Sequence, residues 1–564
     1  MKKEYLMPII MAICVVVGVL IGTFCANHFA GDRLQIINSG SSRLTNLLHV
    51  VDDQYVDAVN LDSLVDKAIP QILGELDPHS VYIPASAAKQ AADDLKGSFS
   101  GIGVEFTLRE DTVRVQRVIA KGPAERAGLL AGDKIVTVDG KAFVGKEMTN
   151  EKVMEALKGP RDTKVKVGVM RYGSKKVTNY EITRGDISQP TVTAAYMLDE
   201  QTGYIKVRSF GENTYPEFIA ALAMLSKDNM ENVVIDLRDN TGGLLQTVAL
   251  MANEFLDRDQ LIVYTQGRKS PREDIRADGR GSYKNIPMVV LINEISASAS
   301  EIFAGAIQDN DRGTIIGRRS FGKGLVQQQM NFTDGSLLRL TVARYYTPSG
   351  RCIQKPYEPG QIVKYEEDLL ERYQNGELYS ADSIHNNGKA FKTRLGRTVY
   401  EGGGITPDIF VPEDTTGVTS YYKEAAMSGL IMQYAYEYTD NNRKKLGTYT
   451  DEKSLEDYLK TQPLVEGFVN YAEKKGLQRR NLMVEKSRGL FTRYLHGRII
   501  YNMQDDKAFV KYLNEDDPVI KETLNVFAKG KAHPSPAKVA FNTIIPFKNN
   551  NVKSQSSALF CWIQ

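Results

Sequence analysis

The sequence predicts a multidomain α+β protein, and three observations lead to this fold class. The chain has 564 residues, of which 42% are hydrophobic, and this is more than one hydrophobic core organises, so several domains are expected. Short alternating strands and glycine turns fill residues 98–186, which indicates a compact β module. Strands then alternate with helices over residues 187–412, which is the pattern of an α/β layer.

The first thirty residues, 1–30, have the pattern of an export signal. Lys2 and Lys3 precede an uncharged apolar run at residues 8–26, which is close to the about 20 residues that span a bilayer. This run predicts an uncleaved membrane anchor with the rest of the chain outside the cytoplasm. A cleaved signal peptide is the alternative interpretation. A buried core helix is disfavoured by the position at the extreme N-terminus.

Four further segments differ from their neighbours in hydrophobic periodicity or in amino-acid composition. Leucines at spacings of three and four indicate an N-terminal helical region at residues 31–97, and similar spacing predicts a helical extension at residues 413–530. A polar insert at residues 355–402 is predicted to be a surface excursion. Residues 531–564 are rich in Asn, Ser, Pro and Lys and lose periodicity, so no structure is predicted for this tail.

Charge and cysteine content narrow the possible functions. Lys and Arg total 71 against 69 acidic residues, and a net charge of +2 gives no reason to expect nucleic-acid binding. The cysteines lie far apart, without metal-ligand spacing or a disulfide framework. They are Cys14, Cys25, Cys352 and Cys561. No metal site is therefore predicted.

The stretch NEISASASEIFAG, residues 293–305, places Ser296, Ser298 and Ser300 at alternate positions. Ser298 and Glu301 match the capping box, so a helix cap is one interpretation of Ser298. An apolar strand that passes through a short turn into a helix is also the arrangement that exposes a nucleophile. The helix N-terminus supplies partial positive charge where an oxyanion forms. The residues alone leave both interpretations open.

A nucleophilic serine needs a base, and no histidine occurs in the α/β segment between residues 204 and 344. The candidate base is Lys323, which lies between two glycines, because burial lowers the pKa of an ammonium group. A solvent-exposed lysine is the alternative. Residues 317–323, GRRSFGK, also match the phosphate-binding pattern G-x-x-x-x-G-K. Gly324 replaces the Ser or Thr that holds magnesium, and a strand-like segment follows, so nucleotide binding is disfavoured.

The segment DLRDNTGG, residues 236–243, ends in the adjacent glycines Gly242 and Gly243 after an apolar strand. Two glycines between a strand and a helix leave backbone N–H groups free to point at a ligand, as in an oxyanion hole. A plain turn with an Asn cap is the alternative.

Together these segments resemble the carboxyl-terminal processing proteases, also called tail-specific proteases. Most of the matching segments are weak signals singly, but they occur in the family's order between residues 43 and 412, and their joint occurrence is highly specific. They are LDPHS from Leu76, GIGV from Gly101, GPAERAGLLAGDKIVTVDG from Gly122, DLRDNTGG from Asp236, SASASEIFAGAIQD from Ser296, SFGKGLVQQ from Ser320, YYTPSGRCIQ from Tyr345 and GGITPDI from Gly403.

The resemblance implies a serine endopeptidase with an α/β core of the crotonase/Clp-protease-like type. By position in the family motif, Ser298 would be the nucleophile, Lys323 the general base, and Gln327 the residue that orients the lysine. The oxyanion hole would combine the N–H of Ala299 with one from the pair of glycines, Gly242 and Gly243. Neither a metal nor an organic cofactor is implied.

The β module resembles a PDZ domain. Its GIGV loop would receive the terminal carboxylate of a substrate, and the substrate tail would add as a strand beside the loop. This loop consists of Gly101, Ile102, Gly103 and Val104. A β-barrel without a ligand is the alternative.

The expected partners are proteins or peptides with free C-termini and, through the N-terminal helix, the membrane. No nucleic acid is expected, and a homo-oligomer is compatible with the resemblance. The expected location is the cell envelope, with an inner-membrane anchor and the catalytic part in the periplasm. The alternative function is a non-catalytic PDZ-type adaptor that binds tails without cutting them. The insert at residues 355–402 and the extension at residues 413–530 carry no family motif.

Overall fold

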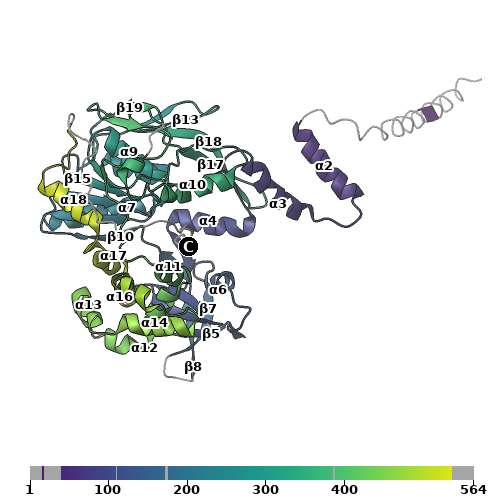
Figure 1. Cartoon of the computed structure of the whole chain (residues 1–564). Coiled ribbons are helices and arrows are strands. Elements are labelled where there is room, and N and C mark those ends of the chain that lie inside the picture. Colours follow the sequence, from purple (N-terminus) through teal and green to yellow (C-terminus); the bar gives the residue numbers. More distant parts are fainter. Residues whose placement is uncertain (1–15, 18–39, 110, 172–175, 385–387, 536–564) are drawn as a thin grey trace, which may run out of the picture. The chain divides into compact units, whose positions relative to one another are not determined.

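A computed structural model describes residues 16–17, 40–109, 111–171, 176–384 and 388–535. The chain divides into two compact units, Met1–Glu75 and Leu76–Gln564 (Figure 1). Over the described residues, no helix combines the length and the apolar character that crossing a membrane requires. Apart from Val16 and Val17, the predicted anchor at residues 8–26 lies outside the described residues.

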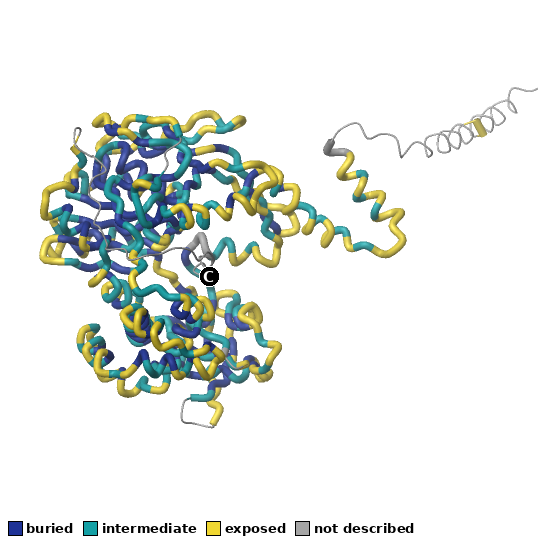
Figure 2. Tube along the Cα trace, in the orientation of Figure 1, coloured by how far each residue is buried: buried dark blue, intermediate teal, exposed yellow. Residues whose placement is uncertain are grey.

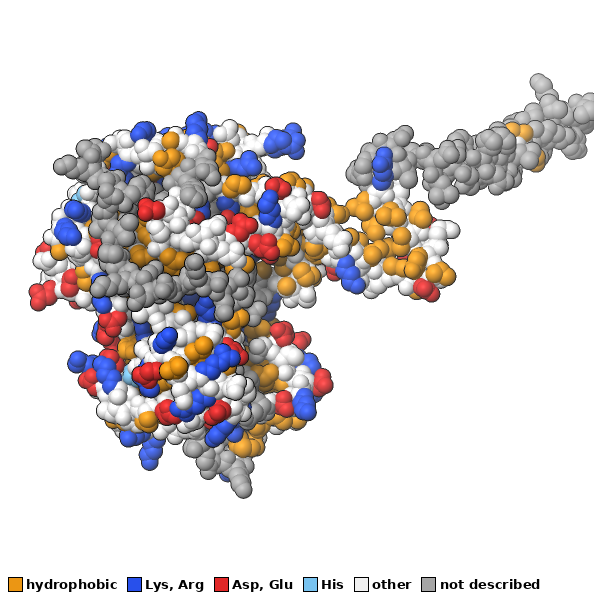
Figure 3. Space-filling model, in the orientation of Figure 1, with side chains coloured by type: hydrophobic (Ala, Val, Ile, Leu, Met, Phe, Trp, Pro, Cys, Tyr) orange, Lys and Arg blue, Asp and Glu red, His pale blue; other side chains and the backbone are white. Residues whose placement is uncertain are grey.

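The first unit contains two helices, α2 (Gly40–Gln54) and α3 (Leu61–Gly74). Asn60 caps α3, because its side chain accepts the N–H of Ser63 at 3.0 Å. Apolar side chains gather on the surface of both helices (Figure 3). The exposed ones include Leu44, Leu47, Val50, Leu64 and Ile72. These helices confirm the predicted N-terminal helical region.

The centre of the second unit is a six-stranded sheet in the order β10-β11-β12-β15-β16-β21. β10 and β11 pair antiparallel, and the other neighbours pair in parallel. The strands are β10 (Val192–Met197), β11 (Thr202–Val207), β12 (Asn232–Asp236), β15 (Met288–Ile292), β16 (Thr314–Gly317) and β21 (Ile409–Phe410). Four of these strands coincide with apolar runs in the sequence that begin near Tyr204, Val233, Met288 and Thr314.

The strands of this sheet lie in the buried interior of the second unit (Figure 2), and side chains on both of their faces belong to hydrophobic cores. Val233 and Ile235 pack on one face with helices α7 (Thr214–Lys227), α8 (Leu245–Asn253) and α9 (Ala299–Asp309). Val234 faces the opposite way and packs with Val519 and Ile520 of helix α18 (Pro518–Ala528). The continuous apolar strands follow from this double burial, since successive side chains alternate between the two faces. The C-terminal extension thus completes the core.

A second, antiparallel sheet lies beside the serine turn, in the order β1-β18-β13-β14 with β17 paired to β18. Its strands are β1 (Val81–Ile83), β13 (Leu261–Gln266), β14 (Glu273–Arg276), β17 (Leu325–Asn331) and β18 (Leu337–Tyr346). The strands β17 and β18 form an antiparallel hairpin. It turns at Asp334-Gly335, a dipeptide that favours hairpin turns.

The β module contains the sheet β3-β4-β5-β7-β8, with β6 paired to β5. Its elements are β3 (Val104–Arg109), β4 (Thr112–Val118), α5 (Pro123–Ala127), β5 (Lys134–Val138), β6 (Lys141–Ala142), α6 (Asn150–Leu157), β7 (Lys164–Met170) and β8 (Val177–Thr183). The strands that enter and leave it, β2 (Ser98–Gly101) and β9 (Gly185–Ser188), pair with each other. Helix α4 (Ala85–Lys96) precedes β2.

The insert at residues 355–402, predicted as a surface excursion, is mostly exposed or half-buried, but it forms regular structure and contributes several buried side chains. The insert contains α10 (Ile362–Gln374), a short 3-10 helix (Ala381–Ser383), and the strands β19 (Ala390–Lys392) and β20 (Thr398–Tyr400). Tyr365, Arg372 and Val399 are buried. A polar segment can contribute to the interior in this way because several of its buried side chains are charged and paired, as Arg372 is with Glu377 at 2.9 Å.

The extension forms helices with a core of their own. They are α11 (Ser420–Met427), α12 (Leu430–Leu446), α13 (Glu452–Lys460), α14 (Leu464–Lys474), α15 (Asn481–Lys486), α16 (Arg488–Met503) and α17 (Asp506–Asn514). The predicted tail begins with structure, since Ala532 is buried and its carbonyl accepts the Thr314 hydroxyl at 3.0 Å. Residues 536–564 lie outside the described residues. The predicted fold class, a multidomain α+β protein with helical regions at both ends, is confirmed.

Candidate active site

Ser298 occupies a strained turn between β15 and α9. Its backbone has φ +56° and ψ −114°, a conformation that non-glycine residues rarely adopt. The turn places the side chain at the N-cap of α9, as in the strand-turn-helix geometry that presents a nucleophile. Gly242 lies directly against it, since a Cβ atom added to Gly242 would come within 2.7 Å of Ser298 Cβ. Only glycine fits beside this serine.

The two flanking serines have structural contacts. The Ser296 hydroxyl donates to the carbonyl of Leu237 at 2.8 Å, and the Ser300 hydroxyl donates to the carbonyl of Asn240 at 2.8 Å. Both serines are fully buried, whereas Ser298 is partly exposed. The flanking hydroxyls therefore tie the serine turn to residues 236–243, and Ser298 is the one that a substrate can reach.

A buried carboxylate joins the serine turn to the segment that carries Lys323. Glu301 accepts the N–H of Ser298 and the N–H of Lys323, both at 2.8 Å. It also accepts the N–H of Gly322 at 2.7 Å and the hydroxyl of Ser320. The capping box predicted at Ser298 is present, but Glu301 reaches beyond its own helix. Capping and exposure of the serine therefore occur together.

A second link comes from Tyr345, which is fully buried on β18. Its hydroxyl donates to the carbonyl of Ser298 at 3.1 Å and also contacts the carbonyl of Lys323. One phenolic proton is thus shared between the serine turn and the segment that carries Lys323. Burial raises the pKa of Tyr345, so the hydroxyl keeps its proton.

Lys323 is half-buried, and burial lowers the pKa of its amine, while the Glu301 carboxylate opposes this effect. A depressed pKa is what a lysine base requires. No hydrogen bond joins Ser298 Oγ to Lys323 Nζ in the described part of the chain. Catalytic hydrogen bonds are often loose before substrate binds. The fold therefore brings the predicted pair to one site without aligning the two atoms.

Gln327 lies on β17, and its side-chain amide donates to the carbonyl of His79 at 2.6 Å. Among the hydrogen bonds of the described residues, none joins Gln327 to Lys323 as the family resemblance implies, so the orienting role of Gln327 remains a prediction. The partner of Gln327 belongs to the segment LDPHS, which lies far away in the sequence.

His79 lies near Lys323, although it is outside the central α/β segment, in which no histidine occurs. Its Nε2 forms a hydrogen bond of 2.8 Å with the hydroxyl of Tyr365, which belongs to α10 of the insert. Burial, helped by the positive charge of Lys323, lowers the pKa of His79 to about 3. The imidazole is therefore neutral, and it lies near Lys323 because folding brings the LDPHS segment to this site. The motif LDPHS was the available signal.

Two of the predicted oxyanion donors are free. The N–H groups of Gly243 and Ala299 have no acceptor among the described residues. The N–H of Gly242 is occupied by the Asn240 side chain at 2.8 Å. Gly243 has φ +147°, and a Cβ atom there would come within 2.2 Å of the Phe210 carbonyl oxygen. The free pair, Gly243 and Ala299, can receive a developing oxyanion beside the helix N-terminus.

The GIGV loop of the β module also presents free backbone N–H groups. The N–H groups of Ile102 and Gly103 lack acceptors within the described residues, while their carbonyls accept the N–H groups of Ala124 at 2.7 Å and Ile119 at 3.0 Å. Gly103 has φ +80°, so the loop requires glycine at this position. These free donors are suited to a carboxylate. Within the described ranges, no cluster of His, Cys, Asp and Glu could hold a metal ion.

Comparisons with known families match three parts of the chain. Peptidase family S41 matches residues 201–363, a PDZ domain matches residues 100–182, and a family of unknown function matches residues 421–505. The β module is therefore a PDZ domain, and the family of unknown function covers most of the helical extension.

Similar proteins carry the same family names. The carboxy-terminal-processing protease of Bartonella bacilliformis is 38% identical over 348 residues, which are 61% of this chain and 79% of that protein. The carboxy-terminal processing protease CtpB of Bacillus subtilis is 34% identical over 327 residues, which are 57% of this chain and 67% of that protein. Among solved structures, the photosystem II D1 C-terminal processing protease is 28% identical with a TM-score of 0.34, and the match covers 67% of this chain and 94% of that chain. This chain belongs to the carboxy-terminal processing proteases of peptidase family S41 and is a serine peptidase with a PDZ domain.

Proposed function

We propose that this peptidase uses a Ser–Lys dyad, with Ser298 as nucleophile and Lys323 as general base, to cleave exported proteins near or from their C-terminal tails. The observation that carries the proposal is the double link between the two segments. Glu301 binds the N–H groups of both residues, and Tyr345 contacts both carbonyls. Two residues held by shared partners are preorganised for one reaction.

The reaction begins when neutral Lys323 takes the proton of the Ser298 hydroxyl and the oxygen attacks a peptide carbonyl. The N–H groups of Gly243 and Ala299 stabilise the negative charge on the carbonyl oxygen. The Lys323 ammonium then gives its proton to the leaving amine. Water, deprotonated by the same lysine, releases the acyl group from Ser298 and restores the hydroxyl.

The PDZ domain supplies the substrate tail in this proposal. A terminal carboxylate binds the free N–H groups of Ile102 and Gly103, and the tail adds as a strand along β3. Support comes from the unpaired donors of the loop and from the match to a PDZ domain at residues 100–182. A substrate whose C-terminus is amidated would lose this carboxylate contact.

The proposed location is the inner membrane, with the catalytic part on the periplasmic side. The support is the uncharged run at residues 8–26 behind Lys2 and Lys3. Extraction of membranes at alkaline pH tests it, because an anchored chain stays in the pellet. Release of the chain with the soluble proteins would contradict the anchor.

The dyad is tested with the full-length chain and an unstructured protein substrate. We expect Ser298→Ala and Lys323→Ala each to lower kcat by at least about 1,000-fold, because the remaining site retains only binding and the oxyanion hole. The control is Lys364→Ala, since Lys364 is exposed and pairs only with Glu358 at the surface. Undiminished cleavage by Ser298→Ala would refute the dyad. Tail binding without any cleavage by the wild type would favour an adaptor.

A further inference from the structure

We propose that the C-terminal extension is part of the catalytic apparatus, because α17 connects the tail-binding strand of the PDZ domain to the oxyanion loop, residues 236–243. In this arrangement Asp517 is a positioning residue for the oxyanion loop, and Asp506 couples it to the PDZ domain. The inference rests on the proposed function, since it assumes that β3 receives substrate tails and that residues 236–243 provide an oxyanion donor.

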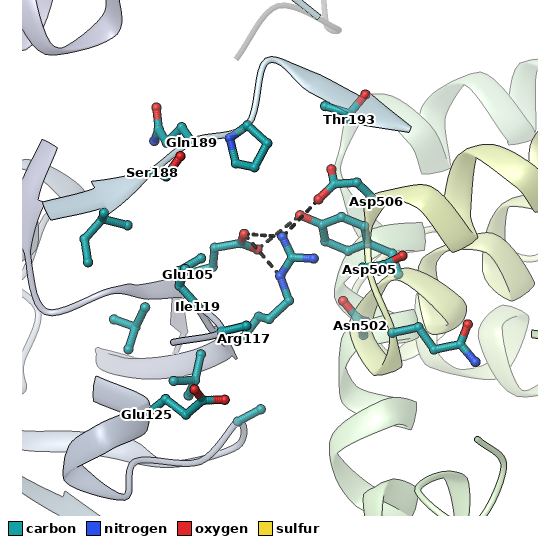
Figure 4. A pocket seen from close by; sticks show the side chains of 18 of the residues that line it. Glu105, Arg117, Ile119, Glu125, Ser188, Gln189, Thr193, Asn502, Asp505 and Asp506 are labelled. Atoms are coloured by element: carbon teal, nitrogen blue, oxygen red, sulfur yellow. Dashed lines mark hydrogen bonds and ion pairs between the residues drawn. The ribbon is translucent and has the colours of Figure 1, made fainter. Parts of the chain in front are cut away.

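At the PDZ end, α17 meets an ion-pair cluster that is shown in Figure 4. Arg117 of β4 donates to Glu105 of β3 at 3.2 Å and to Asp506, the first residue of α17, at 3.1 Å. The Tyr501 hydroxyl donates to Glu105 at 3.1 Å, and the Arg117 guanidinium lies 4.7 Å from the centre of the Tyr501 ring. Glu105 directly follows Val104 of the GIGV loop. The cluster therefore holds the strand on which a tail would bind.

The PDZ domain also meets α12 and α16, because the Tyr436 hydroxyl donates to the Val115 carbonyl at 3.1 Å and Gln116 donates to Asn502 at 3.0 Å. The contact with α17 itself runs through Arg117 and Asp506. Around it lies a cavity of about 770 Å³ between the PDZ domain, the linker at residues 187–193 and the extension (Figure 4). Side chains in a tightly packed interface can move only if they repack. The cavity here leaves the PDZ domain room to shift relative to the extension while its ion pairs stay formed. The Arg117–Asp506 pair is thus the point at which such a shift reaches α17.

At the other end, the extension reaches the oxyanion loop. Arg238 of this loop donates from Nη1 to Asp517 at 2.6 Å, and it forms a second ion pair with Asp236 at 2.6 Å. Asn514, the last residue of α17, donates to the Tyr196 hydroxyl at 2.8 Å. Asp517 thus binds the loop from a position three residues after the end of the helix.

The loop in turn is tied to the serine turn. The Asn240 carbonyl accepts the hydroxyl of Ser300 at 2.8 Å and the N–H of Ala297 at 3.0 Å. The Asn240 side chain holds the N–H of Gly242, next to the free N–H of Gly243. A displacement of Arg238 by a fraction of an ångström therefore reaches an oxyanion donor within a few residues.

The two ion pairs differ in exposure, which ranks their expected effects. The side chains of Arg238 and Asp517 are 15% and 14% exposed, whereas those of Arg117 and Asp506 are 20% and 38% exposed. Water and salt screen the second pair more strongly. Between the pairs, α17 contains neither Gly nor Pro in DKAFVKYLN, so it acts as one rigid rod. We therefore expect the larger kinetic effect at Asp517.

The test uses full-length variants with one change each. Asp517→Ser removes the contact with Arg238 but keeps an N-cap for α18, because Asp517 also accepts the N–H of Val519 at 2.8 Å. Asp506→Ala removes the contact with Arg117. The matched control is Asp516→Asn, since Asp516 is exposed and pairs only with Lys521. Thermal unfolding of each variant confirms that it is folded.

The readouts are kcat and KM for an unstructured substrate with a free C-terminus and for the same substrate with an amidated C-terminus. Asp517→Ser should lower kcat by about 10- to 100-fold with KM nearly unchanged, which is the effect of a misplaced catalytic group. Asp517→Glu should recover part of the loss. Asp506→Ala should lower the ratio of kcat/KM for the free substrate to kcat/KM for the amidated substrate. In the double variant Asp506→Ala/Asp517→Ser, this ratio should be no lower than in Asp517→Ser alone.

Coupling between sites is reciprocal. Phosphonylation of Ser298 by a fluorophosphonate should therefore raise the affinity of the wild type for a peptide with a free C-terminus, and Asp517→Ser should abolish that increase.

The inference would be overturned if folded Asp517→Ser and Asp506→Ala both kept the wild-type kcat and the wild-type ratio of kcat/KM between the free and the amidated substrate. Additive losses in the double variant would overturn the coupling through α17. Cleavage by Ser298→Ala would instead refute the proposed dyad. Equal cleavage of free and amidated tails by the wild type would refute tail capture and with it the coupling, and kcat of Asp517→Ser would then decide the positioning role alone.

Discussion

Replacement of Glu301 by glutamine is the most direct perturbation of the site. The carboxylate is fully buried and accepts four donors, two of which are the N–H groups of Ser298 and Lys323. In Glu301→Gln, an NH₂ group takes the place of one oxygen and faces two of these donors. Each buried donor left without an acceptor costs about 1 to 3 kcal/mol, so the local structure should lose about 2 to 6 kcal/mol.

Hydrogen exchange of the backbone amides measures this loss locally, which suits a chain of several domains. The amides of residues 293–305 and 318–325 should exchange at least about 30-fold faster in the variant, which corresponds to about 2 kcal/mol. The kcat value should fall by about 100-fold, because both catalytic segments lose a shared anchor. The control is Glu366→Gln, an exposed position on α10. Unchanged exchange in both segments would refute the role assigned to the carboxylate.

The same carboxylate predicts a pH dependence. Burial raises the pKa of Glu301 from 4.5 to about 7 in the folded chain, although its hydrogen bonds oppose this rise. The folded state therefore binds a proton that the unfolded state has lost between these two values, and stability contributed by this group is present below pH 4.5 and lost as the pH rises to about 7. A difference of this size corresponds to about 3 kcal/mol. Glu301→Gln should remove this decline. An identical decline in wild type and variant would contradict the assignment.

Further predictions concern other parts of the site. Because burial lowers the pKa of Lys323, kcat should rise with pH through a midpoint below about 10.4, and a flat profile between about pH 6 and 9, with chemistry rate-limiting, would contradict a lysine base. Tyr365→Phe removes the hydrogen bond to His79 and should lower kcat by up to about tenfold without changing tail affinity, as measured by steady-state kinetics and peptide titration. In Gly103→Ala the new methyl group would come within 2.8 Å of Ile187 at φ +80°, so affinity for a free tail should fall by about tenfold or more, whereas labelling of the catalytic serine by a fluorophosphonate should persist. Treatment with EDTA should leave activity unchanged, and its loss would indicate a metal-dependent reaction.

Much of the core was predictable from the sequence, because its strands are short apolar runs. Val233–Asp236 and Met288–Ile292 are buried on both faces, and double burial leaves a continuous hydrophobic signal. The pairing of the strands β13 and β14 leaves no such signal. β14 pairs with β13, and β13 pairs with β18, which lies some eighty residues away in the sequence, so the stability of both strands depends on a partner that local periodicity does not reveal.

The sequence by itself determined the local chemistry of this protein. A serine that begins a helix, a lysine between two glycines and a loop of the GIGV type depend on the backbone geometry of neighbouring residues, and short motifs record that geometry. Such motifs can be recognised before the chain is folded.

The tertiary structure alone decided the partners of these motifs. Three contacts join segments that are distant in the sequence. Tyr345 donates to the Ser298 carbonyl, Gln327 donates to the His79 carbonyl, and Asp517 pairs with Arg238 of the oxyanion loop. Hydrogen bonds and ion pairs reach only about 3 Å, so their partners exist only after the chain has brought those segments together. For this reason the sequence names the reacting residues, and the fold determines what holds them in place.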